Sequence, residues 1–204
     1  MSKKQVLVIH GGDTFETYED YVNYLKNYNF TEEKFQKMKT KRWKDNLQND
    51  LGIEFDVLKP KMPNDRNAKY VEWKIWLDKI LPYLRDEVIL IGHSLGGVFL
   101  AKYLSENKFP IKISQLHIVA APFNDEKEYL GSFKLLDKLS NIQNQVNDIY
   151  LYYSQDDPYD LFLDLEKYTE ALPSAKPEIF ENRGHFLTEE FPELIKNIKE
   201  QLKT

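Results

Sequence analysis

The fold of this chain is decided by one stretch of sequence, Val88-Ile89-Leu90-Ile91-Gly92-His93-Ser94-Leu95-Gly96-Gly97. Its first four residues form a continuous aliphatic run, typical of a strand that is buried on both faces. A helical pattern begins directly afterwards, at Leu95, and continues to residue 106. A serine on such a sharp strand-to-helix turn matches the G-x-S-x-G nucleophile elbow. We therefore predict that Ser94 is a nucleophile. The loop matches neither of the glycine-rich phosphate-binding patterns.

Short apolar runs alternate with helical patterns along the whole chain. Strands are expected at residues 6–9, 55–58, 88–91, 116–120, 149–153 and 178–180. Helices are expected at residues 20–28, 32–51, 71–80, 95–106, 161–171 and 191–202. This alternation predicts an α/β fold with a mostly parallel sheet and helices on both faces. No repeat or linker divides the chain, so residues 1–204 are predicted to form a single domain. Residues 122–147 show no clean pattern.

The composition narrows the class of protein. The chain has 204 residues, a formal net charge of −5 and no cysteine. An acidic chain is a poor partner for nucleic acid, and the lack of cysteine excludes disulfides, a thiolate nucleophile and cysteine-ligated zinc. The apolar run near the N-terminus is too short for a signal peptide, and no run could span a membrane. We expect a cytoplasmic protein that acts on a small molecule, with no metal or organic cofactor.

One predicted helix carries a run of basic residues between positions 34 and 44. They are Lys34, Lys37, Lys39, Lys41, Arg42 and Lys44. Such a run usually forms a solvated face, and the alternative is a contact surface for a protein partner.

A nucleophilic serine needs a base, and the four histidines of the chain narrow the choice. In α/β-hydrolases the order along the chain is serine, acid, histidine. His10 precedes Ser94, His93 is its neighbour in the turn, and His117 lies inside a predicted strand. His185 follows the last strand and precedes the last helix, so it is the predicted base.

The orienting acid is expected where the strand at 149–153 ends. Asp156 and Asp157 both follow this strand, directly before Pro158. Spacing alone leaves both open, and the unused aspartate is expected to cap the next helix or to face water. For the oxyanion hole we expect the backbone N–H of Leu95 and a second N–H from the loop after the first strand. Gly12 is chosen over Asp13 for this second donor.

Several short motifs of the chain resemble a known family. They are the segments at 8–12, 89–94, 154–159 and 184–186, which read VIHGG, ILIGHS, SQDDPY and GHF. On these motifs the chain resembles the small serine hydrolases typified by retinoblastoma-binding protein 9, over nearly its whole length. The resemblance implies that the second aspartate, Asp157, completes the triad. The chain departs from the family at about 29–52, which is longer, and at 122–147, which shows no match.

Together these features predict a serine hydrolase that cleaves a small carboxylic ester through an acyl-enzyme. Ser94 would attack, His185 would move the proton and Asp157 would orient the imidazole. An amide, peptide or thioester substrate is the alternative within the same chemistry. A non-catalytic interaction protein that keeps the fold is the alternative from another class.

Overall fold

A computed structural model of the chain describes residues 3–124, 129–135 and 138–200. Its centre is one six-stranded sheet in which every neighbouring pair of strands is parallel. The strands are β1 (Lys4–Ile9), β2 (Phe55–Leu58), β3 (Val88–His93), β4 (Ile113–Val119), β5 (Val146–Ser154) and β6 (Lys176–Phe180). All six predicted strands are therefore confirmed. Most of them extend beyond the apolar runs that predicted them.

The order of the strands across the sheet is β2-β1-β3-β4-β5-β6. The chain therefore builds outward in one direction to β2 and then, from β3, in the other. In open parallel sheets, the crevice at such a switch point, beyond the carboxyl ends of the strands, is where ligands bind. The loop after β1 and the turn after β3 meet there, and these segments hold Gly12 and Ser94.

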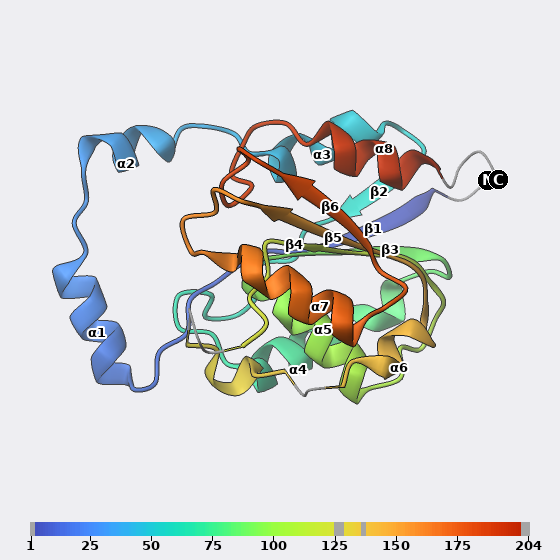
Figure 1. Ribbon diagram of the computed structural model, residues 1–204, viewed down its shortest axis with the longest axis horizontal. Helices are drawn as coiled ribbons and strands as arrows, with labels where there is room; N and C mark the ends of the chain where they lie inside the picture. Colours follow the sequence, from blue (N-terminus) through green and yellow to red (C-terminus); the bar gives the residue numbers. More distant parts are fainter. Residues whose placement is uncertain (1–2, 125–128, 136–137, 201–204) are drawn as a thin grey trace.

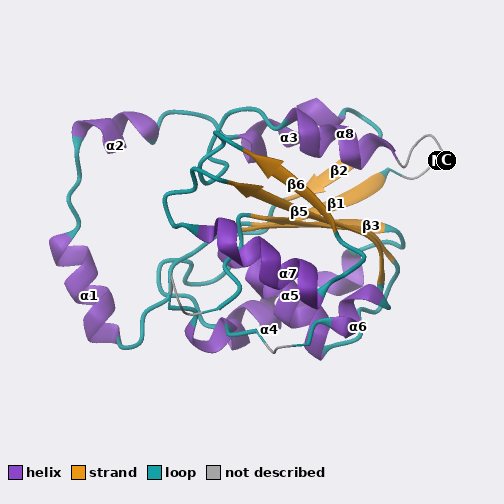
Figure 2. Ribbon diagram, viewed as in Figure 1, coloured by secondary structure: helices purple, strands orange, loops and turns teal. Residues whose placement is uncertain are grey.

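The described residues form eight α-helices, and six of them cover the two faces of the sheet (Figures 1 and 2). The eight helices are α1 (Tyr18–Asn27), α2 (Glu32–Lys37), α3 (Trp43–Leu51), α4 (Tyr70–Ile80), α5 (Leu95–Glu106), α6 (Ser140–Gln143), α7 (Asp164–Ala171) and α8 (Pro192–Glu200). Three short 3₁₀ turns accompany them: η1 (Leu81–Tyr83), η2 (Gly131–Phe133) and η3 (Leu161–Leu163). α3 and α8 lie on one face, and α4 to α7 lie on the other (Figure 1). The predicted α/β architecture is thus confirmed.

α1 and α2 do not belong to either layer. They lie beyond the edge toward which the strands point, at the left of Figure 1. No residue of either helix is buried. The chain makes this excursion between β1 and β2, before α3 returns to the sheet.

The prediction of one helix over 32–51 is wrong. The helix ends at Lys37, and a new one begins at Trp43. Trp43 is 1% exposed within the apolar cluster under the sheet, and its backbone N–H donates to the carbonyl oxygen of Thr188 at 2.9 Å. Burial of this large ring outweighs helix propensity, so the chain bends to place it. The basic residues from 34 to 44 therefore do not share one helix face.

Two other regions differ in detail from the expected pattern. The segment 122–147 contains only η2, α6 and the first residues of β5 in its described part, and residues 125–128 and 136–137 lie outside the described residues. The helix expected at 161–171 begins as the 3₁₀ turn η3, and the last helix is described to Glu200. Its expected end at 201–202 lies outside the described residues. The single sheet supports the prediction of one domain over 1–204, which stays a prediction.

Within the ranges that the structure describes, no helix is both long enough and apolar enough to cross a membrane.

The elbow after β3 depends on an unusually close contact between backbones. A Cβ added at Gly96, in the first turn of α5, would lie 2.6 Å from the carbonyl oxygen of His10 and even closer to that of Ile9. Only a residue without a side chain lets α5 approach β1 this closely.

We predict that Gly96→Ala destabilises the protein, although alanine is the better helix former by about 1 kcal/mol. The added methyl group must displace backbone, so the free energy of unfolding should fall by roughly 1–3 kcal/mol. Urea denaturation measures this change. The control Lys196→Ala, at an exposed position on α8, should stay within about 0.5 kcal/mol of wild type. A more stable Gly96→Ala protein would contradict the assignment.

Candidate active site

The turn predicted around Ser94 is present and strained. Ser94 has φ 55° and ψ −128°, a combination that non-glycine residues rarely adopt. Its N–H donates to the carbonyl oxygen of Val119 at 2.8 Å, and its own carbonyl oxygen accepts from the N–H of Gly97 at 2.8 Å. These bonds hold the serine at the junction of β3 and α5, where the carboxyl ends of the central strands meet.

His185 lies on the loop between β6 and α8 and pairs with Asp157. The two atoms Nδ1 of His185 and Oδ2 of Asp157 are 2.9 Å apart, and the two residues are 8% and 7% exposed. The other carboxylate oxygen of Asp157 accepts from the N–H of Tyr159 at 3.0 Å. Because a carboxylate accepts, Nδ1 donates to Asp157, and in the neutral form of the ring the lone pair is on Nε2. This leaves Nε2 able to accept a proton.

Asp156 has a different task from that of its neighbour. Its Oδ1 accepts from the backbone N–H of Gly184 at 2.7 Å and from the hydroxyl of Ser154 at 2.5 Å. Both hydrogen bonds hold the pKa of the Asp156 carboxyl below its usual range, and the bond from Ser154 has the larger effect. Asp156 is exposed to water, and its hydrogen bonds brace the histidine loop rather than cap the next helix.

His93 connects the elbow to the histidine loop. Its Nε2 lies 2.9 Å from the carbonyl oxygen of His185, and its Nδ1 lies 3.0 Å from Nζ of Lys44. A carbonyl only accepts, so Nε2 is the protonated nitrogen and Nδ1 accepts from the lysine. The rings of His93 and His185 lie 5.0 Å apart. The residue beside Ser94 thus holds the backbone of His185.

The start of α3 supports the same loop from the side of the sheet. Nε1–H of Trp43 donates to the carbonyl oxygen of Phe186 at 2.9 Å. Lys44 reaches His93 from the next position, and burial, aided by the nearby charge of Arg42, lowers the Lys44 pKa to about 8. Sequence reasoning missed these contacts and placed Lys44 on a solvated face. No local pattern signals a bond between residues 49 positions apart.

The loop after β1 lies directly against the elbow. A Cβ added at Gly11 would be 3.0 Å from Cβ and 3.4 Å from Oγ of Ser94. The His10 ring holds this loop, because its Nδ1 donates to the carbonyl oxygen of Gly11 at 2.6 Å. The N–H of Asp13 donates to the carbonyl oxygen of Asp65 at 2.8 Å. Among the described residues, none accepts from the N–H of Gly12.

His117, the remaining histidine, is a core residue, as its place in a strand predicted. It is fully buried, and Nδ1 lies 2.9 Å from the hydroxyl oxygen of Tyr152. Burial lowers its pKa to about 3, so the ring is neutral.

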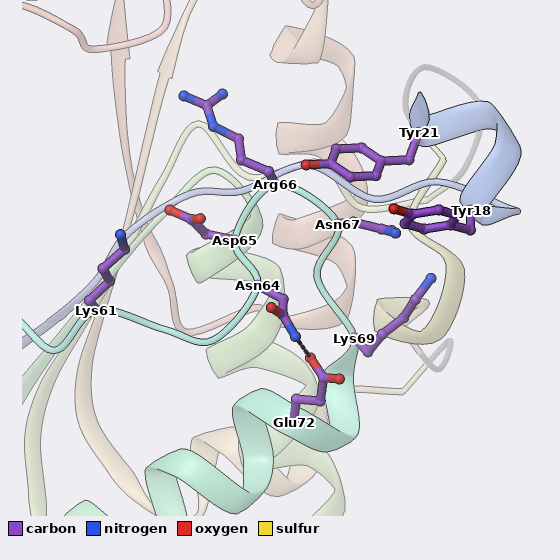
Figure 3. A pocket seen from close by; sticks show the side chains of 9 residues that line it. All are labelled: Tyr18, Tyr21, Lys61, Asn64, Asp65, Arg66, Asn67, Lys69 and Glu72. Atoms are coloured by element: carbon purple, nitrogen blue, oxygen red, sulfur yellow. Dashed lines mark hydrogen bonds between the residues drawn. The ribbon is translucent and has the colours of Figure 1, made fainter. Parts of the chain in front are cut away.

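Two cavities flank the loop after β1. The smaller has a volume of about 180 Å³ and includes both Gly12 and Leu95 in its wall. The larger, of about 570 Å³, lies between α1 and the segment 61–72 and is lined mainly by polar side chains (Figure 3). Of the two, the smaller cavity adjoins the elbow, so it is the candidate site for the reacting group.

The fold and this site define an α/β hydrolase. The model of the serine hydrolase family matches residues 33–202, so the chain belongs to the serine hydrolase family and is a hydrolase. It is 28% identical over 152 residues to serine hydrolase RBBP9 of Rattus norvegicus, which covers 72% of this chain and 78% of that protein. The resemblance stated from the motifs is therefore confirmed.

Solved structures share the same fold. The ydeN gene product from B. subtilis superposes with a TM-score of 0.71 at 16% identity, over 99% of this chain and all of that one. An esterase from Exiguobacterium antarcticum gives a TM-score of 0.59 at 15% identity, over 100% of this chain and 93% of that one. At such identities these similarities support the fold alone.

We predict that the burial of Lys44 makes stability depend on pH above neutrality. The folded protein releases the Lys44 proton near pH 8, whereas the unfolded chain keeps it to about pH 10.4. The unfolded state therefore binds more protons in this window, and the free energy of unfolding should rise with pH. Relative to Lys44→Met, wild type should gain on the order of 1–2 kcal/mol between pH 7.5 and 9.5.

Urea denaturation of both proteins across this range measures the difference. Subtracting the free energy of unfolding of Lys44→Met from that of wild type cancels the contribution of the tyrosines, which titrate in both proteins. If the two free energies of unfolding change in parallel with pH, the lowered pKa of Lys44 is contradicted.

Proposed function

We propose that Ser94, His185 and Asp157 form the catalytic triad of a hydrolase that cleaves small carboxylic esters. The observation that carries this proposal is the 2.9 Å contact between the buried His185 ring and Asp157, on a loop that His93 holds against the elbow. A serine on a strained turn, an imidazole and an orienting carboxylate are the three groups that acyl transfer through serine requires.

The reaction proceeds in two displacements. As Oγ of Ser94 attacks the ester carbonyl, Nε2 of His185 takes the hydroxyl proton, and Asp157 stabilises the imidazolium. The proton then passes to the leaving alcohol as the C–O bond breaks, which leaves an acyl-enzyme. His185 next takes a proton from water, whose oxygen attacks the acyl carbon. The carboxylic acid departs, and the proton returns to Ser94.

The negative charge that develops on the carbonyl oxygen needs two backbone donors. Leu95 is the first residue of α5, so its N–H lies at the positive end of the helix dipole. The second donor is the N–H of Gly12. The choice of Gly12 over Asp13 is supported because the N–H of Asp13 is already engaged by Asp65.

The absence of cysteine in the chain supports a reducing compartment, and we infer that the enzyme works in the cytoplasm. Amide and thioester substrates use the same groups. Measuring kcat/KM for an ester, an amide and a thioester of the same acyl group ranks the three kinds of substrate directly.

We predict that Ser94→Ala lowers kcat for 4-nitrophenyl butanoate by about 10⁶-fold, because loss of a triad nucleophile leaves only binding and the oxyanion donors. A fluorophosphonate probe should label wild type and not the variant, while thermal unfolding of the two stays similar. Wild type that neither reacts with the probe nor turns over esters would favour the non-catalytic alternative. Unchanged turnover by the variant would move the nucleophile elsewhere.

We predict that the two neighbouring aspartates differ sharply in their effect. Asp157→Asn should lower kcat by roughly 10⁴-fold, because the amide favours the wrong tautomer of His185. Asp156→Asn keeps an oxygen that can accept from Gly184, so its kcat should fall less than about tenfold. Steady-state kinetics with one ester substrate measures both variants. The reverse ranking would assign the acid to Asp156.

A further inference from the structure

The cavity beside the elbow has both apolar and polar groups in its wall. Three aromatic rings line it, and so do Leu95 and Leu130; the rings are Phe15, Tyr24 and Tyr129. Two of its polar side chains are engaged by other residues. The carboxylate of Asp13 pairs with Arg66 at 3.3 Å, and the hydroxyl of Thr14 donates to the carbonyl oxygen of Tyr129. The rings and the two leucines therefore offer contact surface to an apolar occupant.

The volume of this cavity limits what it can hold. It measures about 180 Å³. A protein cavity of about 150 Å³ accommodates benzene, so this one takes about six carbon atoms of an acyl group. A longer chain must leave the cavity past one of its walls.

Two of the rings that line the cavity begin a continuous row of rings, which we call the aromatic ladder: Phe15 before α1, Tyr24 on α1, and Tyr28 and Phe30 after it. Neighbouring ring centres lie 5.2, 5.6 and 6.0 Å apart. The ladder thus leads from the reacting centre out onto the surface of the protein.

The ladder is exposed to an extent that packing within the fold does not explain. Tyr24, Tyr28 and Phe30 are 38%, 41% and 57% exposed, and α1 has no buried residue. A contiguous exposed apolar patch of this kind marks an interaction site.

We propose that the aromatic ladder binds the distal part of a long, apolar acyl chain whose first six or so carbons fill the cavity. This assignment rests on the proposed function and extends it from small esters to esters of medium- and long-chain acids. Successive rings are tilted by 43°, 61° and 59°. They therefore offer a curved apolar surface for a flexible chain rather than parallel faces for planar groups.

The chain-length dependence of hydrolysis tests this proposal. Wild type, Tyr28→Ala/Phe30→Ala and the control Tyr83→Ala are assayed with 4-nitrophenyl esters from acetate to dodecanoate, below the micellar concentration. Tyr83 is 78% exposed on η1, far from the ladder in sequence. Each methylene that the ladder buries should raise kcat/KM of wild type by about two- to fourfold.

The readout is the ratio of kcat/KM for dodecanoate to that for butanoate. The ratio should be at least tenfold lower in the double variant than in wild type. Tyr28→Phe keeps the ring, so its ratio should stay near that of wild type. Tyr83→Ala should leave the ratio unchanged. An unchanged ratio in the double variant overturns the proposal. Thermal unfolding confirms that the variants stay folded.

A binding measurement separates this proposal from the proposed function. Calorimetry with the Ser94→Ala protein compares free dodecanoate with butanoate, with and without the double substitution. If wild type hydrolyses no ester, the proposed function fails. Dodecanoate that binds more tightly than butanoate, and loses this advantage in the double variant, would still support acyl binding by the ladder. Equal binding of the two acids overturns it. Sedimentation velocity tests the alternative that the ladder binds a second copy of the chain. In that case wild type would be a dimer, the double substitution would dissociate it, and acyl binding would not change.

Discussion

The close contact between α5 and the end of β1 is the constraint on which the rest of this structure depends. Gly96 has no side chain, so the first turn of α5 can lie against the carbonyl oxygens of Ile9 and His10. This approach brings Ser94 beside Gly11 and forces the serine backbone to φ 55°. The strain at one residue is sustained because buried backbone on both sides leaves no other path. The parallel order of the sheet then brings the later loops to the same edge.

The candidate base is positioned by its backbone as much as by its side chain. Asp156 holds the N–H of Gly184, His93 holds the carbonyl oxygen of His185, and Trp43 holds that of Phe186. These three partners come from the turn after β5, from β3 and from α3, so the loop is fixed from three sides. A loop restrained in this way keeps a catalytic group within a narrow range of geometry, which effective acyl transfer needs.

The excursion between β1 and β2 contributes two different things to the protein. Its last part, α3, packs on the sheet and sends Lys44 to the elbow. Its first part is α1 and the residues on either side of it, which together hold the aromatic ladder, and no residue of α1 is buried. The segment between β1 and β2 thus supports the histidine loop through α3 and provides the proposed acyl-binding surface through the ladder. The larger, polar cavity lies between α1 and the loop before α4 (Figure 3).

Local patterns in the sequence determined the six strands, the elbow at Ser94 and the choice of His185, because each depends on periodicity, small residues or chain order within a short span. Spacing left Asp156 and Asp157 open, and the family resemblance favoured Asp157, while the helical pattern joined α2 and α3 into one helix. Only the tertiary structure shows that Asp157 contacts the His185 ring and that the chain bends between α2 and α3. It also reveals the contacts of Lys44 and the ladder. The reason is physical: burial of Trp43, and hydrogen bonds between residues tens of positions apart, exist only once the sheet has brought distant segments together.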